Sequence, residues 1–366
     1  MKMNNSEIKV LLTASGGIHA LGVIDCLKNN YEKRKIKIIC TDMEEKELLK
    51  NKADGFYIVP KGNSKKFINT ILKICQKEKI DIIIPGNADE ILSISKNIEL
   101  FNSRNIKTTI SNFNNLNIIL NKEKTYSKLK KIGINIPEYY RVKNYKEFLQ
   151  AIKKLGYPKK NICFKPSKYS ESGGTRGFRI LRQKNTAKKI MLHKKPDSVE
   201  IDFETTKSAL KNTGPIDLLV MEHLPGDEFS TYVFAEKGKM IYCISNLRQK
   251  LDRYYSFEAK IQKNKKIEIM CKKIIEELEL TSNVNIQFKN SKNNIPKLIE
   301  INPRIGGTII LPSVSGINLP YLAIKQCLNE KIPTIKKSKE IRMIRYWKEL
   351  FLQDSKTFEI NNNLKI

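Results

Sequence analysis

Apolar runs of strand length alternate with amphipathic, helix-length segments over the first hundred residues. One of these segments carries apolar residues at positions 18, 21, 24 and 27, the spacing of one helix face. This alternation predicts an open, mostly parallel sheet with helices between its strands. The runs expected to form the strands are 9–15, 36–42, 55–60, 80–86 and 107–111.

Glycine and polar residues follow the carboxyl ends of these expected strands, where ligands gather in open sheets. Gly16, Gly17 and Gly22 lack the G-x-G-x-x-G spacing of a dinucleotide site, so a turn that requires glycine is the favoured interpretation. The polar residues at these ends are Asp42, Asn87, Asp89 and Glu90.

The pattern changes after residue 112. A helix with apolar positions at 126, 129 and 132 is expected to end at Gly133, which fits a C-terminal cap. From 145 to about 240 the pattern indicates shorter strands around a Gly-rich loop. The lysine-rich stretch 183–215 carries no clear periodicity and receives no assignment.

Two strands, a helix and a tail are expected towards the C-terminus. The helix at 318–330 begins after Asn318, a residue type that caps helix N-termini. The tail from 331 carries one apolar cluster at 341–352, which is expected to pack against the body of the protein. The two strands are 284–288 and 297–302.

The two late strands carry polar side chains at alternate positions. In a strand, alternate residues share a face, so Glu300 and Asn302 point one way, and Asn285 and Gln287 form a similar pair. A polar loop would allow the two strands to pair antiparallel, with Gln287, Glu300 and Asn302 converging. Such oxygen ligands with little full charge suit Mg²⁺ that is also held by nucleotide phosphates. The alternative is an ordinary exposed sheet face.

A lysine precedes a Ser- and Gly-rich loop in residues 161–181. Cys163 and Phe164 place Lys165 in a core-like strand, unlike the many surface lysines of this chain. Backbone N–H groups of such a loop close over phosphates, and a strand-held lysine neutralises them. A hairpin without ligand is the alternative.

Residues 217–234 contain a buried strand that runs into a Pro-Gly turn. Glu222 stands where a carboxylate would accept from an adenine amino group, and Glu228 where it would bind ribose hydroxyls. Acids beside turns are common, so this signal is weak by itself. The three histidines, at 19, 193 and 223, have no metal or triad spacing and are interpreted as structural or surface residues.

Composition adds a net charge of +30, from 57 Lys and 11 Arg against 38 acidic residues. Lysine is spread evenly along the chain instead of clustering with Arg and aromatic residues, so a solvated surface is favoured over a nucleic-acid site. Seven dispersed cysteines indicate reduced, buried thiols. No apolar run of about 20 residues appears, so we expect no membrane span and a cytoplasmic protein.

Together these segments strongly resemble the ATP-grasp superfamily over nearly the whole chain. The segment "LNKEKTYSKLKKIGINIPEYY" looks like the family helix with its nucleotide-contacting lysine, and "FKPSKYSESGGTRG" is similar to the second lysine and its phosphate-covering loop. The adenine hinge is matched by "VMEHLPGDEF". The most specific match is "NIQF…LIEINPRIGG".

The resemblance assigns roles to individual residues. Glu300 would bridge two Mg²⁺ ions (Mn²⁺ is an alternative), with Gln287 and Asn302 each binding one. Arg304 would face the transferred phosphoryl group, together with Lys165, and Arg248 is a further candidate for phosphate contact whose competitor is a surface ion pair. The residues expected to bind ATP are Lys122, Lys165, Ser172, Gly173, Gly174, Met221, Glu222, Leu224 and Glu228.

The resemblance also implies an architecture. A parallel pre-ATP-grasp sheet at 1–112 precedes an ATP-grasp domain at 113–330 with a lid subdomain at about 140–222. Residues 331–366 then pack on the body. Gln287 replaces the acid of many members, which is typical of the branch that resembles the carbamoyl phosphate synthetase large subunit.

The implied activity is that of a stand-alone ligase that activates a carboxylate as an acyl phosphate and couples it to an amine. A small-molecule acid and amine are the expected substrates, a thiol acceptor stays open, and a homodimer is compatible with the resemblance. One alternative is a carbamoyl-phosphate-type or kinase-like enzyme that stops at a phosphorylated product. Another is a non-catalytic protein that binds nucleotide or nucleic acid.

Overall fold

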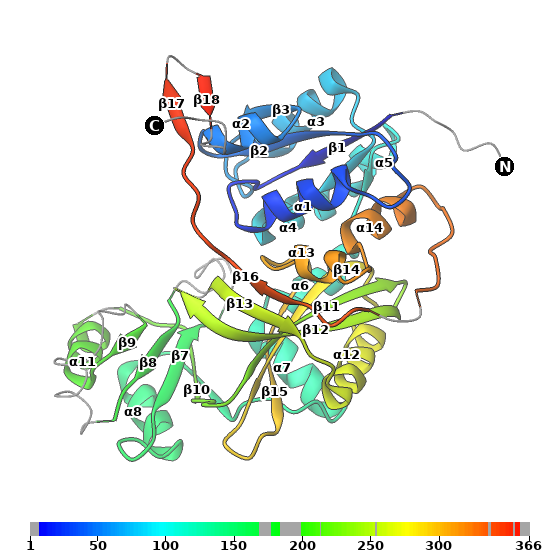
Figure 1. Ribbon diagram of the computed structural model, residues 1–366. Coiled ribbons are helices and arrows are strands. Elements are labelled where there is room, and N and C mark those ends of the chain that lie inside the picture. The colour runs from blue at the N-terminus through cyan, green and yellow to red at the C-terminus, as the bar shows by residue number, and fades with distance from the viewer. Residues whose placement is uncertain are drawn as a thin grey trace. The chain divides into compact units, whose positions relative to one another are not determined.

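The computed structural model describes residues 7–167, 177–183, 199–212, 214–252, 255–335, 338–353 and 356–358. The chain divides into two compact units, each built from separate stretches of sequence (Figure 1). The first unit comprises 1–113, 229–285 and 302–366, and the second comprises 114–228 and 286–301.

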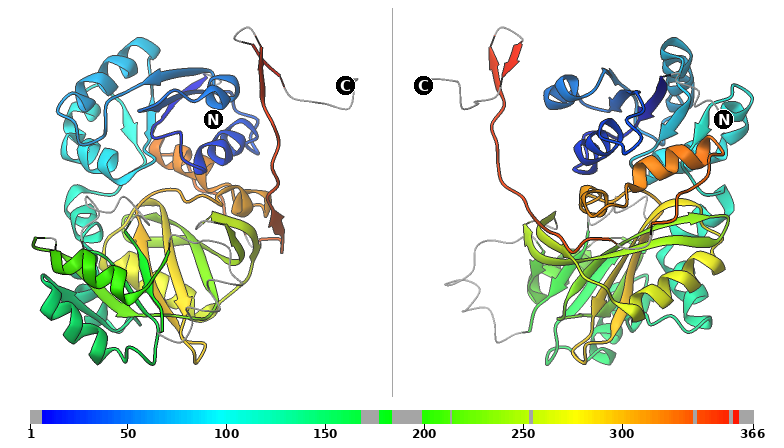
Figure 2. Two further views of the ribbon diagram at one scale, coloured as in Figure 1. Left: turned by 90° about the vertical axis from the view of Figure 1, so that its left-hand side faces the viewer. Right: turned by 45° about the vertical axis from the view of Figure 1, so that its right-hand side comes forward.

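The predicted N-terminal sheet is confirmed as an all-parallel sheet with the strand order β3-β2-β1-β4-β5. Helices cover both of its faces (Figure 2). Neighbouring residues of β1 serve opposite faces, since Leu12 packs with Val23 of α1 while Leu11 packs with Phe67 of α3. The elements are β1 Ile8–Leu12, α1 His19–Lys28, β2 Ile36–Asp42, α2 Glu47–Lys52, β3 Gly55–Ile58, α3 Phe67–Glu78, β4 Ile82–Ile84, α4 Ala88–Lys96, α5 Ile98–Asn102 and β5 Lys107–Thr108.

The polar residues at the carboxyl ends of these strands are bonded to one another. The Asp42 carboxylate accepts from the Gly16 N–H at 2.7 Å. The Asn87 side chain caps α4 by accepting from the Glu90 N–H at 2.9 Å. The buried Glu90 carboxyl accepts from the Thr13 hydroxyl, and burial raises its pKa to about 7. These contacts fix the loops of the sheet edge.

Gly86 follows β4 in the tightest of these loops. A Cβ at this position would lie 2.4 Å from the Thr13 carbonyl oxygen and 2.6 Å from His19 Nε2. We therefore expect Gly86→Ala to lower the free energy of unfolding by about 1–3 kcal/mol, because overpacking forces the backbone to shift. Gly214→Ala is the control, since nothing lies within 4 Å of its Cβ position. Urea denaturation compares the two variants; equal midpoints would contradict the steric reading.

A six-stranded sheet contributes strands from the middle and the end of the chain. Its strand order is β15-β14-β11-β12-β13-β16, and the boundary between the two units passes through β14 and β15. α14 begins after Asn318, whose side chain accepts from the Tyr321 N–H as expected. The elements are β11 Glu228–Glu236, β12 Lys239–Asp252, β13 Tyr255–Ile261, α12 Lys265–Glu277, β14 Ser282–Asn290, β15 Pro296–Asn302, α13 Ile310–Val314, α14 Leu319–Cys327 and β16 Arg342–Ile344.

The second unit contains a five-stranded sheet with the order β6-β10-β7-β8-β9. Phe148 of α8 packs edge-on against Phe164 of β7, with ring centroids 5.5 Å apart, in the core of this unit. The stretch left unassigned from sequence includes β9 and α11. The elements are α6 Phe113–Ile119, α7 Lys122–Lys131, β6 Tyr139–Val142, α8 Tyr145–Lys154, β7 Ile162–Pro166, β8 Arg179–Leu181, β9 Glu200–Ile201, α11 Phe203–Asn212 and β10 Leu218–Glu222.

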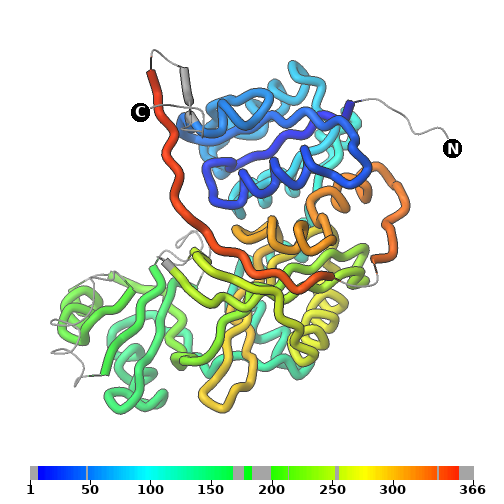
Figure 3. Tube along the Cα trace, viewed as in Figure 1, coloured from blue at the N-terminus to red at the C-terminus, as the bar shows by residue number. Residues whose placement is uncertain are grey.

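The expectation for the tail is confirmed in part. β16 pairs antiparallel with β13, and Met343 packs against the core opposite Ala259. The same cluster continues into an extended segment (Figure 3) in which Tyr346 and Trp347 are 80% exposed, so packing on the body was a wrong prediction for these two. A hairpin of β17 (Phe351–Gln353) and β18 (Lys356–Phe358) follows. Among the described residues, no helix is both long and apolar enough to cross a membrane.

Candidate functional site

Two buried lysines and a glutamate meet in the second unit. Lys122 is the first residue of α7, held by the Asn121 cap, whose side chain accepts from the Lys124 N–H at 3.0 Å. Lys165 lies in β7, and Glu300 lies in β15. Lys122 and Lys165 are each only 6% exposed, which is rare for a lysine. The structure therefore places both predicted nucleotide lysines away from the surface that carries most of the others.

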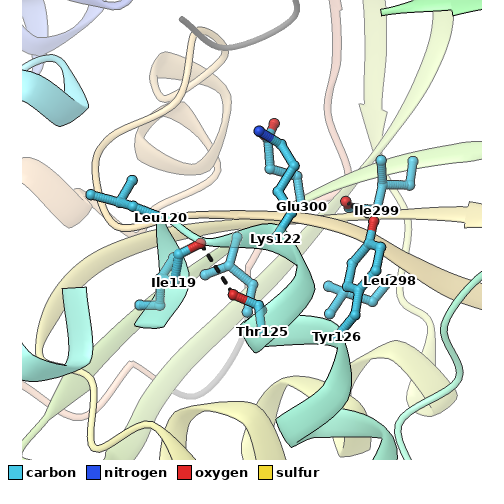
Figure 4. Close-up of a pocket in the computed structure, with 9 residues that line it drawn as sticks. Ile119, Leu120, Lys122, Thr125, Tyr126, Leu298, Ile299 and Glu300 are labelled. Carbon is cyan, nitrogen blue, oxygen red and sulfur yellow. Dashed lines mark hydrogen bonds between the residues drawn. The ribbon is translucent and has the colours of Figure 1, made fainter. Parts of the chain in front are cut away.

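A small pocket opens between α7 and β15 (Figure 4). The Lys122 and Glu300 side chains extend in the same direction in this view, and Tyr126 reaches towards Ile299. The residues that line the pocket are Ile119, Leu120, Lys122, Thr125, Tyr126, Leu298, Ile299, Glu300 and Ile301.

Tyr126 and the backbone of β15 hold Lys165 in place. The Lys165 ammonium donates to the Tyr126 hydroxyl at 3.4 Å and to the Ile299 carbonyl at 3.3 Å. It also lies 5.6 Å from the centre of the Tyr126 ring, a favourable cation–π position. Tyr126 in turn donates its hydroxyl to the Ile299 carbonyl at 2.5 Å. Sequence reasoning used Tyr126 only as an apolar helix position, although its place four residues after Lys122 puts both on one helix face.

The electrostatics of the pocket favour an anionic ligand. Burial lowers the pKa of Lys122 to about 8, with Glu300 opposing the shift and Lys165 adding to it. Burial also lowers the pKa of Lys165, again against the opposing effect of Glu300. Two desolvated ammonium groups with one facing carboxylate are under-compensated, because each buried charge needs a partner. A polyanion such as a nucleotide phosphate chain would supply the missing negative charge.

The predicted metal ligands lie on neighbouring strands near the unit boundary. Gln287 and Glu300 are half-buried residues of the second unit, whereas Asn302, two residues after Glu300 in β15, is counted with the first unit. Asn285, predicted to accompany Gln287, is turned to structural work and donates to Ser230 Oγ at 2.8 Å. Among the residues that the structure describes, no group of three or more His, Cys, Asp or Glu could hold a metal.

The predicted adenine hinge follows β10. Met221 and Leu224 are buried, as expected for residues beneath a base. The Glu222 carboxylate accepts from the Glu138 N–H at 2.9 Å and pairs with Lys297. Lys297 is a partner that sequence reasoning missed, although it shares β15 with Glu300.

Contacts with β14 fix the turn after the hinge. The Gly226 N–H donates to the Asn290 carbonyl at 3.0 Å, and a Cβ at Gly226 would lie 2.8 Å from that oxygen. Beyond the turn, Glu228 lies 3.5 Å from the ammonium of Lys289. The turn is therefore held between two sequence-distant strands.

The predicted arginines belong to the first unit. Arg304 donates to the Ile305 carbonyl at 2.9 Å. Burial lowers the pKa of His19 to about 3, and the nearby positive charge of Arg304 adds to this shift. Arg248, in β12, donates to the Ser256 hydroxyl at 2.8 Å. The predicted loop residues Ser172, Gly173 and Gly174 lie outside the described residues.

Two protein-family models match the chain. One, described as "ATP-grasp in the biosynthetic pathway with Ter operon", matches residues 215–349, which include the hinge and both late strands. The other, the PylC-like N-terminal domain, matches residues 10–109, which form the parallel sheet. The two matches fall on the two parts of the chain that the sequence pattern had separated.

Two curated proteins are similar in sequence. The carbamoyl phosphate synthase large chain of Clostridium acetobutylicum is 21% identical over 280 residues, which are 71% of this chain and 23% of that protein. An uncharacterized protein of Methanocaldococcus jannaschii is 30% identical over 199 residues, 53% of this chain and 42% of that protein. The chain thus spans less than half the length of either relative.

A solved structure shares the fold. The N5-carboxyaminoimidazole synthetase from Staphylococcus aureus, complexed with ADP, superposes with a TM-score of 0.67 at 15% identity. The match covers 94% of this chain and 84% of that one. Similarity at this level of identity establishes the architecture, and the residues of this chain must carry the functional argument.

Proposed function

Because this chain is an ATP-grasp protein, we propose that it is an ATP-dependent ligase that couples a small-molecule carboxylate to an amine and releases ADP and phosphate. The observation that carries the proposal is the buried arrangement of Lys122 and Lys165 with Glu300. Two desolvated ammonium groups favour a polyphosphate over a neutral ligand.

Gln287, Glu300 and Asn302 fit a magnesium site because all three offer the hard oxygen atoms that Mg²⁺ prefers. Mg²⁺ at this position would neutralise the β- and γ-phosphates and so let an anionic carboxylate approach the terminal phosphorus. Only Glu300 contributes a full negative charge. We therefore propose that the metal, two Mg²⁺ ions or Mn²⁺ in their place, is held jointly with ATP and binds weakly without it.

The remaining candidate residues would hold the nucleotide. Met221 and Leu224 would pack on the adenine, with Glu222 accepting from its amino group and Glu228 from the ribose hydroxyls. Glu222 would then release or share its present contact with Lys297. The loop containing Ser172, Gly173 and Gly174 would close over the phosphates.

The chemistry requires two displacements. A carboxylate oxygen attacks the γ-phosphorus of ATP, and the bond to ADP breaks, which gives an acyl phosphate. The amine nitrogen then attacks the acyl carbon, phosphate leaves with the bonding electron pair, and the nitrogen loses a proton to give the amide. Arg304 would stabilise the phosphoryl oxygens and the tetrahedral intermediate, and Arg248 would support it, because a guanidinium fork matches such oxyanions.

A screen of paired acids and amines for ADP release tests this function. We expect release that requires both substrates, and a condensed product whose mass equals acid plus amine minus water. ADP release with acid alone, together with a stable phosphorylated acid, would replace the ligase by a kinase-like enzyme. Tight DNA binding at physiological salt without any ATP turnover would refute an enzymatic role.

The pKa of Lys122 gives a pH dependence. Since this pKa is lowered to about 8 in the protein without ligand, Lys122 is protonated at pH 7 and mostly neutral at pH 9. Binding of Mg–ADP at pH 9 must therefore take up a proton, and its Kd should rise about tenfold between pH 7 and 9. Lys122→Arg stays charged over this range and should show a flatter profile. Isothermal titration calorimetry measures both; parallel profiles would contradict the role of Lys122.

A further inference from the structure

Arg345 follows β16 in the tail of the first unit. Its N–H donates to the Phe257 carbonyl at 2.9 Å, which extends the β13–β16 ladder by one residue. Alternation along the strand places its side chain on the face of Met343, which packs on the core, and opposite to the exposed Arg342. The ladder thus directs this arginine inward.

The Arg345 guanidinium joins two parts of the first unit. Its Nη1 donates to the Ser256 carbonyl at 2.8 Å, and its Nη2 donates to the Gly307 carbonyl, in the turn that follows β15. Arg248 donates to the hydroxyl of the same Ser256. Arg304 bonds to the Ile305 carbonyl, two residues before Gly307. Three arginines therefore surround one turn of the chain.

Arg345 differs from most described arginines in its partners. Arg34, Arg141, Arg182 and Arg342 each pair with a carboxylate. Within the described part of the chain, Arg345 contacts only main-chain carbonyls, which occupy two of its five N–H donors. Burial lowers its pKa, and the charge of Arg248 lowers it further, although the group stays protonated. Two neighbouring like charges, half-buried, need an anion.

We propose that Arg345 and Arg248 form the binding site for the carboxylate of the acid substrate. This inference rests on the proposed ligase function and deepens it. The remaining guanidinium donors match the planar, two-oxygen geometry of a carboxylate. The shared turn keeps this site next to Arg304, where the carboxylate must meet the phosphoryl group. The segment after the ATP-grasp strands would thereby select the acid.

Trp347 provides a direct reporter of this site. It is the single tryptophan of the chain and lies two residues after Arg345. Its ring centroid is 6.4 Å from that of Phe257, the residue that accepts the Arg345 N–H and follows Ser256. An anion bound by Arg345 should change the surroundings of the indole and hence its fluorescence.

The binding experiment titrates wild type, Arg345→Gln and Arg342→Gln with formate, acetate, succinate and citrate, with KCl at equal ionic strength as reference. Arg342 is the matched control, because it is 56% exposed and pairs with Glu258. We expect a saturable change with at least one acid in wild type and Arg342→Gln, and binding at least about tenfold weaker in Arg345→Gln. Absence of an Arg345-dependent response to all four acids would overturn the proposal.

Kinetics separate this inference from the proposed function. With an acid found by the ADP-release screen, Arg345→Gln should raise KM for the acid about tenfold or more and leave KM for ATP unchanged, with partial recovery in Arg345→Lys. An unchanged KM for the acid would refute the Arg345 site and leave the ligase intact. Arg345-dependent acid binding without any turnover would support the site and refute the ligase.

Discussion

Glu300→Gln should reduce substrate-dependent ADP release by roughly 10³-fold, comparable to the loss of a transition-state stabilising group. Glutamine preserves the shape of the side chain and removes the only full negative charge among the three proposed metal ligands. The same charge also opposes the burial of two lysines, so its loss should lower the pKa of Lys122 below about 8. The rate and the pH dependence of nucleotide binding should therefore change together.

The control for this variant is Glu276→Gln, an exposed carboxylate of α12 that pairs with Lys272 one helical turn away. It removes the same charge far from the pocket residues in sequence, and its rate should equal that of wild type. A Glu300→Gln rate within about tenfold of wild type, a barrier difference of only ~1.4 kcal/mol, would show that Glu300 does not hold the metal.

Lys165→Met should lower activity and raise stability. The rate should fall by roughly 10²-fold or more, because the buried ammonium would no longer neutralise phosphate. Methionine fits the buried position and removes the cost of a desolvated charge, so the free energy of unfolding at pH 7 should rise by about 1 kcal/mol. The Ile299 carbonyl would still accept from Tyr126, and no acceptor would be left without a donor.

The pH dependence distinguishes this effect from a general packing change. The pKa of Lys165 is lowered in the folded protein, so the unfolded chain binds more protons between the folded pKa and about 10.5. Its contribution to wild-type stability therefore improves as pH rises through that window, and the advantage of Lys165→Met should shrink. Urea midpoints at pH 7 and pH 10 measure this difference. A variant that is less stable than wild type at pH 7 would contradict the prediction.

The N-terminal sheet could be predicted because its signal is local. Each strand is a short apolar run, and β2 forms over the expected residues 36–42. The boundaries of β4 and β5 contracted, since apolar residues continue beyond the last ladder hydrogen bond. Stretches of mixed polarity gave no comparable signal, and α11 went unassigned because its apolar residues are sparse.

The site was predictable only in part. A residue type at a motif position could indicate Lys122, Lys165 and Glu300, but their burial and the support from Tyr126 depend on contacts between segments far apart in the chain. Arg345 gave no signal at all, because its role depends on the pairing of β16 with β13. The apolar pattern of the tail equally could not show that Trp347 would be left without a packing partner.

The order of assembly during synthesis follows from how the first unit is pieced together. Strands β1 to β5 are contiguous in sequence, so their sheet can form soon after residue 113 leaves the ribosome. The six-stranded sheet must wait for residue 344, and until then β13 presents an unpaired edge of backbone amides and carbonyls. Newly made chains halted between these points should therefore be the species that chaperones hold and that aggregate most readily.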